Sequence, residues 1–229
     1  MKKWIPFVAA GLYALYAPLP TWYTKHADKR ALRQADGGKV MLTFDDGPDP
    51  RYTGRLLELL ARYDVPASFF VTAEHALACP ELIAEMKRRG HLIGFHSASH
   101  QNALLTAPWT VQKDFEKMKL AADYLGVPFR WYRPPWGHAN LMTRYEIEHC
   151  GLRLVMWDVM CEDWQRSATP EVIAQKLLER VHRGAVICLH DSGGAQGAPE
   201  HTLGALEMAL PKLLARGYEF VKVDGTMLS

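Results

Sequence analysis

The sequence pattern that most constrains the fold begins at Val40. Short apolar, β-branched runs alternate from there with longer stretches of helical periodicity, which is typical of parallel β/α units. Seven runs are candidate strands: 40–44, 67–71, 92–95, 129–133, 152–157, 185–190 and 218–223. Seven units are too few for a regular eight-stranded barrel. The sequence therefore predicts an α/β fold with a distorted seven-stranded (β/α) barrel, and an open doubly wound sheet is the alternative.

Helix ends are visible between the strands. Thr169 and Pro170 form an N-cap followed by proline in the first helical position. Gly126 and Gly217 have the position of residues that end helices. These boundaries support the division into alternating strands and helices.

The N-terminal segment differs from the rest of the chain. After Lys2 and Lys3, residues 4–23 carry no charge, and about 20 apolar residues can span a bilayer as a helix. We expect a membrane anchor or a signal peptide, and Pro18 after the best cleavage motif favours an uncleaved anchor. The two lysines would keep the N-terminus in the cytoplasm and place the domain outside. The alternative is a loosely packed N-terminal arm, because prolines interrupt the run.

The predicted organisation has three parts. Residues 1–23 are the hydrophobic segment, 24–39 a charged, solvated linker, and 40–229 a single domain. The 27 basic and 25 acidic residues are spread along the chain, so no strong electrostatic field indicates a nucleic-acid partner. The four cysteines have no short paired spacing, and we expect buried free thiols.

Unusual polar groups gather where five candidate strands end. Each group alone has an ordinary explanation, such as turn chemistry or a structural ion pair. The carboxyl ends of parallel strands meet at one rim, however, and active sites form there. Five groups at one rim therefore favour a functional site. They are Asp45-Asp46-Gly47-Pro48, His96 to His100, Arg133 to Gly137, Asp158 to Trp164, and His190-Asp191.

Asp46, His96 and His100 are the candidate metal ligands. One carboxylate and two imidazoles leave a zinc ion an open position. The histidines are four residues apart, so one helical turn would aim both the same way. Zinc is the first choice of metal, and manganese, iron, cobalt or nickel also accept this ligand set.

The same rim supplies candidate acid and base groups. A divalent metal that activates water for hydrolysis works with a base, and Asp45, beside Asp46, is placed for that role. Arg133 is predicted to pair with Asp45. An amine leaving group needs a proton, and His190 is the candidate donor.

The ordered motifs resemble the polysaccharide deacetylase family, which is the NodB homology group or carbohydrate esterase family 4. The resemblance runs from about Val40 to the C-terminus and covers five motifs in order. They are Thr43 to Gly47, His96 to His100, Arg133 to Gly137, Asp163-Trp164 and Leu189-His190.

The resemblance implies a distorted barrel and metal-dependent hydrolysis of the N-acetyl group of N-acetylglucosamine-type sugars. It implies that Asp45 is the general base, that His190 is the general acid, and that Arg133 orients the base. It also implies that the backbone N–H of Trp136 stabilises the oxyanion. The metal ligands that it implies are Asp46, His96 and His100.

The chain departs from the family pattern at Met160. The family motif Asp-x-x-Asp-Trp is taken to pair its first aspartate with the acid histidine, and methionine cannot take that role. Asp158 and Asp163 are the candidate replacements, and on this interpretation Asp158→Asn should lower kcat. Two further departures, Trp136 for tyrosine and Phe95 for asparagine, make the pocket more apolar.

The sequence leaves several functions open. The leading one is a monomeric, extracytoplasmic, membrane-tethered deacetylase of peptidoglycan or chitin-like glycans. The alternatives are a metal-binding carbohydrate module with little turnover, motivated by Met160, and a deacetylase of a membrane amino-sugar lipid. Trp136 and Trp164 are the tryptophans expected to stack on sugar rings.

Overall fold

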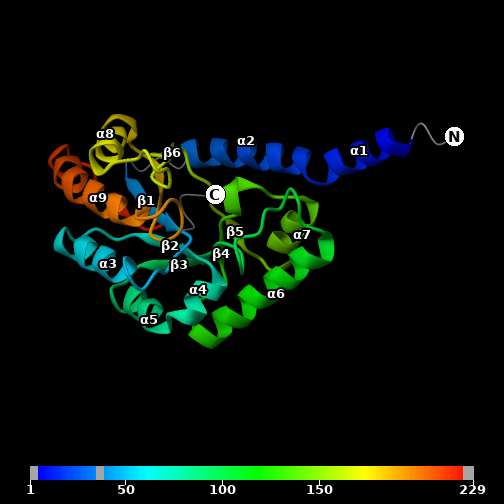
Figure 1. Ribbon diagram of the computed structural model, residues 1–229, viewed down its shortest axis with the longest axis horizontal. Helices are drawn as coiled ribbons and strands as arrows, with labels where there is room; N and C mark the ends of the chain where they lie inside the picture. The colour runs from blue at the N-terminus through cyan, green and yellow to red at the C-terminus, as the bar shows by residue number, and fades with distance from the viewer. Residues whose placement is uncertain (1–4, 35–38, 224–229) are drawn as a thin grey trace.

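A curled parallel sheet forms the centre of the molecule, and the helices lie around its outside (Figure 1). The computed structural model describes residues 5–34 and 39–223. Seven strands follow the order β5-β4-β3-β2-β1-β7-β6, and β8 pairs with β1. The strands are β1 (Val40–Asp45), β2 (Ser68–Val71), β3 (Leu92–Phe95), β4 (Trp131–Tyr132), β5 (Arg153–Leu154), β6 (Val159–Met160), β7 (Val186–His190) and β8 (Phe220–Val221).

The distorted barrel predicted from the sequence is confirmed. Each of the seven predicted strands has a counterpart, although several are shorter than expected. Strand β6 lies in a segment that was expected to be a loop. No pairing among the described residues joins β6 to β5, so the sheet remains an open half-barrel.

The helices begin and end where the sequence indicates. Thr169 accepts a hydrogen bond from the backbone N–H of Val172 at the start of α8, and Gly126 has φ 58° after the end of α6. Gly217 has φ 79° just after α9 (Ala198–Ala215), so the three predicted helix ends are confirmed. The helices around the sheet are α3 (Thr53–Arg62), α4 (Ala73–Ala78), α5 (Pro80–Arg88), α6 (Pro108–Leu125), α7 (Leu141–His149), α8 (Pro170–Arg180) and α9 (Ala198–Ala215).

The central strands β1 and β2 are buried on both faces, and the two faces carry different residues. In β1, Val40, Leu42 and Phe44 belong to the main core between sheet and helices, whereas Met41 belongs to a second cluster. Successive side chains alternate between faces, so Thr43 and Asp45 follow Met41 into the interior of the half-barrel. The apolar interior cluster closes the barrel below the strand ends: Met41, Phe70, Trp131, Val155, Met156, Val186 and Val223.

The N-terminal residues form two consecutive helices, α1 (Ile5–Tyr16) and α2 (Pro18–Gln34). The predicted linker over 24–39 is therefore wrong up to residue 34, because α2 continues through it; residues 35–38 of that linker lie outside the described residues. No residue of α1 is buried, and none of the described helices combines the length and apolar character needed to cross a bilayer. Lys2 and Lys3, on which the predicted orientation depends, also lie outside the described residues.

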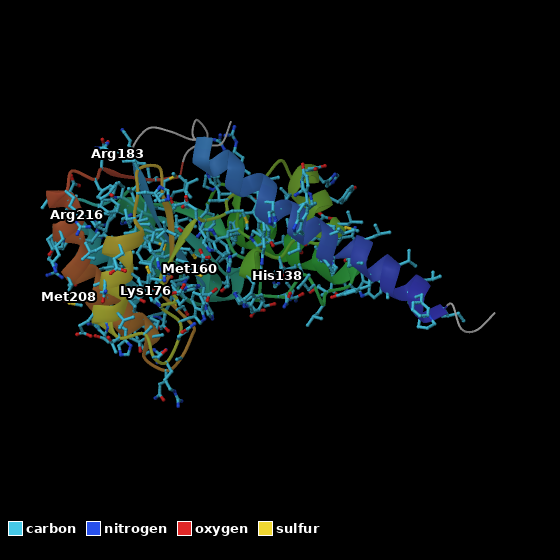
Figure 2. The ribbon with its side chains drawn as sticks, turned by 90° about the horizontal axis from the view of Figure 1, so that it is seen from above. His138, Met160, Lys176, Arg183, Met208 and Arg216 are labelled. Atoms are coloured by element: carbon cyan, nitrogen blue, oxygen red, sulfur yellow. The ribbon has the colours of Figure 1, made fainter. Side chains whose placement is uncertain are left out.

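One side of α2 packs against the barrel domain. Thr21 and Thr24 are buried, and the Thr21 hydroxyl donates to the carbonyl of Ala139 and accepts from its N–H, at 3.2 and 3.1 Å. Figures 1 and 2 show the two helices crossing one edge of the domain, with the start of α1 projecting beyond it. The segment thus contacts the domain through α2 and through the end of α1, where the Tyr16 hydroxyl donates to the carbonyl of Thr106 at 3.1 Å. Most apolar side chains of α1 are exposed.

All four cysteines are free, as the sequence predicted. Three are buried, and Cys150 is half-buried.

Candidate active site

The polar side chains that the sequence singled out converge at the C-terminal rim of the half-barrel. Asp45 ends β1 and lies in register with His190, which ends the adjacent β7. His96 directly follows β3, and Arg133 directly follows β4. The pleat points all four side chains into the interior, above the apolar cluster that closes the barrel.

Asp46, His96 and His100 form a compact group of ligands. Oδ1 of Asp46 lies 3.5 Å from Nε2 of His96 and 3.2 Å from Nε2 of His100. Ligand atoms about 2.1 Å from a tetrahedral zinc ion are about 3.4 Å apart, so these separations suit one shared cation. Oδ1 of Asp46 is buried and has no hydrogen-bond partner, which leaves it available to a metal.

The surroundings of the group favour an ionised Asp46 carboxylate and a neutral His96 imidazole, the forms that bind a metal. Burial alone would raise the pKa of Asp46, but the imidazoles of His100, His96 and His190 lower it to about 2. Burial lowers the pKa of His96, which favours the neutral imidazole that a metal binds. His96 also donates from Nδ1 to the carbonyl of Arg133 at 2.8 Å, so its Nε2 faces Asp46.

The loops that carry these ligands are not helical. A turn over Ser97–Ser99 separates His96 from His100, so the expected helical turn is wrong although both imidazoles face Asp46. Asp46, Ser97 and His100 have φ of 76°, 73° and 54°. Non-glycine residues adopt this left-handed region at an energetic cost, and such strain concentrates at functional sites.

Arg133 holds Asp45 in the interior. Its guanidinium is 0% exposed and donates to Oδ1 of Asp45 at 2.7 Å and to the Thr43 hydroxyl at 2.6 Å. It also donates to the carbonyls of Val155 and Met156. The predicted pair of Arg133 with Asp45 is therefore present, and it leaves Oδ2 of Asp45 facing the pocket.

Asp163 is the partner of His190. Its Oδ1 lies 2.8 Å from Nδ1 of His190, and its Oδ2 accepts from the His190 backbone N–H and the Thr202 hydroxyl. Burial would lower the pKa of His190, but the charge and hydrogen bond of Asp163 raise it to about 9. Of the two candidates, the structure thus places Asp163 against the histidine.

Asp158 is far from His190, so its proposed role as the replacement partner is wrong. It accepts from the backbone N–H of Val186 at 2.8 Å and lies 3.2 Å from Nε2 of His182. Val186 starts β7 and His190 ends it, a separation of about 13 Å at 3.3 Å per residue. Asp158 is therefore at the opposite end of the strand from the site.

A cavity of about 300 Å³ opens over these residues. Its polar floor contains the two aspartates and the three histidines, and its walls are mostly aromatic and sulfur-containing. Trp136 and Trp164, the two tryptophans selected from the sequence, both line it. The lining residues are Asp45, Asp46, His96, His100, Trp136, Trp157, Met160, Trp164, Cys188, His190 and Gly194.

Trp136 stands at the mouth of the cavity in the short 3-10 helix η2 (Pro135–Gly137). Its ring centroid lies 4.2 Å from that of His100, its side chain is 48% exposed, and its φ is 54°. Among the described residues its backbone N–H has no hydrogen-bond partner. The ring and the free N–H are thus both available to a ligand.

Several residues of the site have roles that the sequence did not predict. Cys188 and Trp157 line the cavity, and Met160, considered only as a lost aspartate, forms part of its wall (labelled in Figure 2). Cys188 precedes His190 by two residues, so the alternation of β7 could have placed it inside. Asp191 accepts from the Thr53 hydroxyl at 2.6 Å and abuts Gly47, where a Cβ would lie 2.2 Å from its carboxylate. It supports the turn that follows Asp45 and Asp46.

Comparison with known proteins agrees with this geometry. A family model described as polysaccharide deacetylase matches residues 33–155, more than half of the chain. The chain belongs to the polysaccharide deacetylase family.

Other members of the polysaccharide deacetylase family are similar over most of this chain. A peptidoglycan-N-acetylglucosamine deacetylase of Listeria monocytogenes is 33% identical over 81% of the chain, which spans only 38% of that protein's length. A peptidoglycan-N-acetylglucosamine deacetylase of Bacillus cereus is 30% identical over 81% of this chain and 86% of its own. A chitooligosaccharide deacetylase of Rhizobium leguminosarum is 30% identical over 80% of this chain and 89% of its own.

Solved structures share the fold. The Bc1960 peptidoglycan N-acetylglucosamine deacetylase superposes with a TM-score of 0.74 at 28% identity, covering 81% of this chain and 86% of its own. A family 4 acetyl xylan esterase of Clostridium thermocellum, in complex with a cobalt ion, gives 0.72 at 32% identity, covering 80% and 87%. A pseudoenzyme of Bacillus anthracis gives 0.71 at 22% identity over 81% of this chain and 64% of its own, which supports the fold alone.

Proposed function

We propose that this polysaccharide deacetylase removes N-acetyl groups from N-acetylglucosamine-type residues of a glycan, with peptidoglycan or chitin-like oligosaccharides as the substrate class. The observation that carries the proposal is the position of Asp45. Its Oδ2, which accepts from the Cys188 thiol at 3.3 Å, lies 3.9 Å from Nε2 of His96 in the ligand group and close to His190 on the adjacent strand. A base and an acid thus flank one cavity that also has a metal-ligand set.

A divalent ion fits the group of Asp46, His96 and His100. The fit rests on the unpartnered, buried Oδ1 of Asp46 and on the two imidazole Nε2 atoms that face it. When bound, such an ion polarises a carbonyl and lowers the pKa of water. Zinc is the proposed ion, and cobalt, nickel and manganese suit the same ligands.

Asp45 and His190 supply the two proton transfers of an amide hydrolysis. Asp45 accepts a proton from the attacking water at Oδ2, because Oδ1 is held by Arg133. His190 donates a proton from Nε2 to the leaving nitrogen, because its Nδ1 is held by Asp163. With a pKa of about 9, His190 carries that proton at neutral pH. A charged acid suits the departure of an amine, which supports N-deacetylation over O-deacetylation.

The mouth of the cavity suits a carbohydrate. The free backbone N–H of Trp136 is placed to donate to the oxyanion, a contribution of about 2.7–4 kcal/mol in comparable enzymes. The faces of Trp136 and Trp164 offer apolar surfaces for a sugar ring. Met160 and Trp157 extend this apolar wall.

The alternative of a carbohydrate-binding module with little turnover rested on the absence of a partner for His190. Asp163 provides that partner, so this motivation is removed. The fully formed Asp45–Arg133 pair also favours turnover.

We further propose that the domain is monomeric and lies outside the cytoplasm, attached to the membrane through its N-terminal segment. The support is the uncharged run over residues 4–23 and the exposed apolar side chains of α1, including Phe7 and Leu12. Sedimentation of full-length protein with membranes, and its release after deletion of residues 1–16, would test the attachment. Recovery of full-length protein entirely in the soluble fraction would refute it.

The activity is tested by offering full-length protein with added zinc or cobalt to N-acetylglucosamine oligomers, peptidoglycan fragments and acetylated xylan. Mass spectrometry should show loss of acetyl groups and new free amines on the N-acetylated substrates, and a much lower rate on xylan. Asp45→Asn should bind the metal and release no acetate. Equal rates on xylan would contradict the N-deacetylase assignment, and absence of metal-dependent acetate from every substrate would refute the hydrolase.

A further inference from the structure

A second cluster of metal-binding side chains lies beside the first. Asp45, Cys188 and His190 each place a ligand atom within 4.8 Å of the other two. They come from the interior faces of adjacent strands, since Asp45 pairs in register with His190 and Thr43 pairs with Cys188. Among the described residues, this group and the Asp46 group are the two such clusters.

Each side chain of the second cluster places one ligand atom within the cluster, and the hydrogen bond from the Cys188 thiol to Oδ2 of Asp45 joins two of these atoms. Oδ1 of Asp45 is bound by Arg133, which leaves Oδ2 at 3.3 Å from Sγ of Cys188. Oxygen and sulfur ligands of a tetrahedral zinc ion are about 3.6 Å apart, close to this separation. The thiol of Cys188 is fully buried from bulk solvent and lines the cavity.

The orientation of His190 is the second observation that points to a metal. Its Nδ1 is fixed by Asp163, and this leaves Nε2 facing the cavity. A carboxylate on one ring nitrogen and a free second nitrogen is the arrangement that orients histidine ligands in metalloproteins. His96 of the Asp46 group is held in the same way by a carbonyl.

We propose that Asp45, Cys188 and His190 form a second, inhibitory site for a thiophilic dication such as zinc or cadmium. A thiolate, an imidazole and a carboxylate suit these ions, whereas magnesium and calcium prefer oxygen ligands alone. The site is distinct from the Asp46 group in its ligands and in its metal preference.

Charge balance allows a dication in this buried position. The ion replaces two protons, one from the Cys188 thiol and one from Nε2 of the His190 imidazolium, and both protons pass to water. Before binding, the Asp45 carboxylate and the imidazolium sum to zero. After binding, the dication is balanced by the Asp45 carboxylate and the Cys188 thiolate, so no net charge is added.

Binding at this site withdraws the base and the acid from catalysis. Oδ2 of Asp45 and Nε2 of His190 are the atoms that the proposed reaction uses, and the second ion takes both. Only this effect on turnover rests on the proposed function. Activity should therefore rise as zinc fills the Asp46 group and fall again at higher zinc.

Cobalt titration of full-length protein tests the site without a substrate. We expect two equivalents to bind and a sulfur-to-cobalt charge-transfer band to appear with one of them. Cys188→Ala and the nearly isosteric Cys188→Ser should both lose that band and one binding event. Cys161 is also fully buried but does not line the cavity, so Cys161→Ala should keep both the band and the second binding event. The loss of cobalt affinity at this site should exceed the roughly 10- to 100-fold loss that follows removal of a residue that only contacts a metal ligand.

The following results separate this inference from the proposed function. A single equivalent of cobalt, or a second equivalent unaffected by Cys188→Ala and Cys188→Ser, would overturn the second site. Asp46→Ala should remove the other binding event and keep the thiolate band. If Asp46→Ala changes nothing while the Cys188 variants lose the band, the second site stands and the proposed ligand set fails. Excess zinc should inhibit wild-type protein and Cys161→Ala, but not Cys188→Ala.

Discussion

The hydrogen bond from His190 to Asp163 determines the charge of the proposed acid. Burial lowers the pKa of the imidazole, but the charge and hydrogen bond of Asp163 have the larger effect and raise the pKa to about 9. The acid is active when protonated, so kcat/KM should fall as pH rises through about 9. Asp163→Asn removes the opposing charge but not the burial, and the basic limb should move to lower pH. A pH–rate profile measures this shift.

The control for that experiment is Asp158→Asn. Asp158 contacts Val186 and His182 and is remote from His190, so its profile should match that of the wild type. A shift in Asp158→Asn with none in Asp163→Asn would contradict the assignment.

Arg133 has a structural role that can be measured separately. Its guanidinium is fully buried against Asp45, and removing one partner of a buried ion pair costs about 3–5 kcal/mol. Arg133→Gln should therefore lower the free energy of unfolding in urea by that amount. Arg180→Gln breaks a partly exposed pair with Glu162 and should cost about 0–1 kcal/mol. Equal losses in the two variants would show that the buried pair adds no stability.

Single residues of the site were predictable where residue chemistry and strand ends agreed. Asp45, Asp46, His96 and His190 have ligand or proton-transfer groups directly at strand ends, and the structure brings them together. The partner of His190 was ambiguous because the chain bends after β6. Glu162 has φ 52°, which breaks the alternation of the strand before Asp163. Counting from Met160 could therefore not determine which carboxylate points inward.

Among the elements, helix α2 supports the loop that carries Trp136. Thr21 exchanges two hydrogen bonds with Ala139, which follows η2 by two residues, and α2 packs against η2 itself. Thr21→Val leaves buried backbone groups without partners, at a cost of about 1–3 kcal/mol. We expect a lower midpoint of urea unfolding and a reduced kcat.

Trp22→Ala is the matched control in the same helix. Its side chain is 58% exposed, so kcat and stability should remain close to wild type. If both variants, or neither, lower kcat, α2 does not position the Trp136 loop.

The elements themselves were largely predictable because buried parallel strands give continuous apolar runs. Strand β6 has two residues, as do β4, β5 and β8, but it lies within the segment from Asp158 to Trp164 that the polar residues marked as a loop at a strand end. The continuation of α2 into the predicted linker was missed because the charged residues were taken as evidence of a solvated linker. A helix with one face on the domain and one in water accepts the same composition.

At the scale of the whole molecule, one rim of the open half-barrel carries both clusters of ligands, which come from the ends of β1 and β7 and from the loops that follow β1 and β3. The formal net charge of +2 gives no long-range attraction for an anionic polymer, so recognition depends on the cavity and its aromatic walls. The fold and the position of the site at the strand ends could be predicted from the sequence because both depend on the alternation of apolar strands with amphipathic helices. The facing of Cys188 toward Asp45 depends on strand register, which the sequence pattern does not specify.

The most direct test of metal-dependent deacetylation is acetate release from N-acetylglucosamine oligomers by chelated and metal-reconstituted full-length protein. Wild type should lose activity on chelation and regain it with about one equivalent of zinc or cobalt. Asp45→Asn should bind that equivalent with little change in affinity and release no acetate, whereas Asp46→Asn should fail to bind it. Full acetate release by chelated wild-type protein, or by metal-loaded Asp45→Asn, would contradict the proposed mechanism.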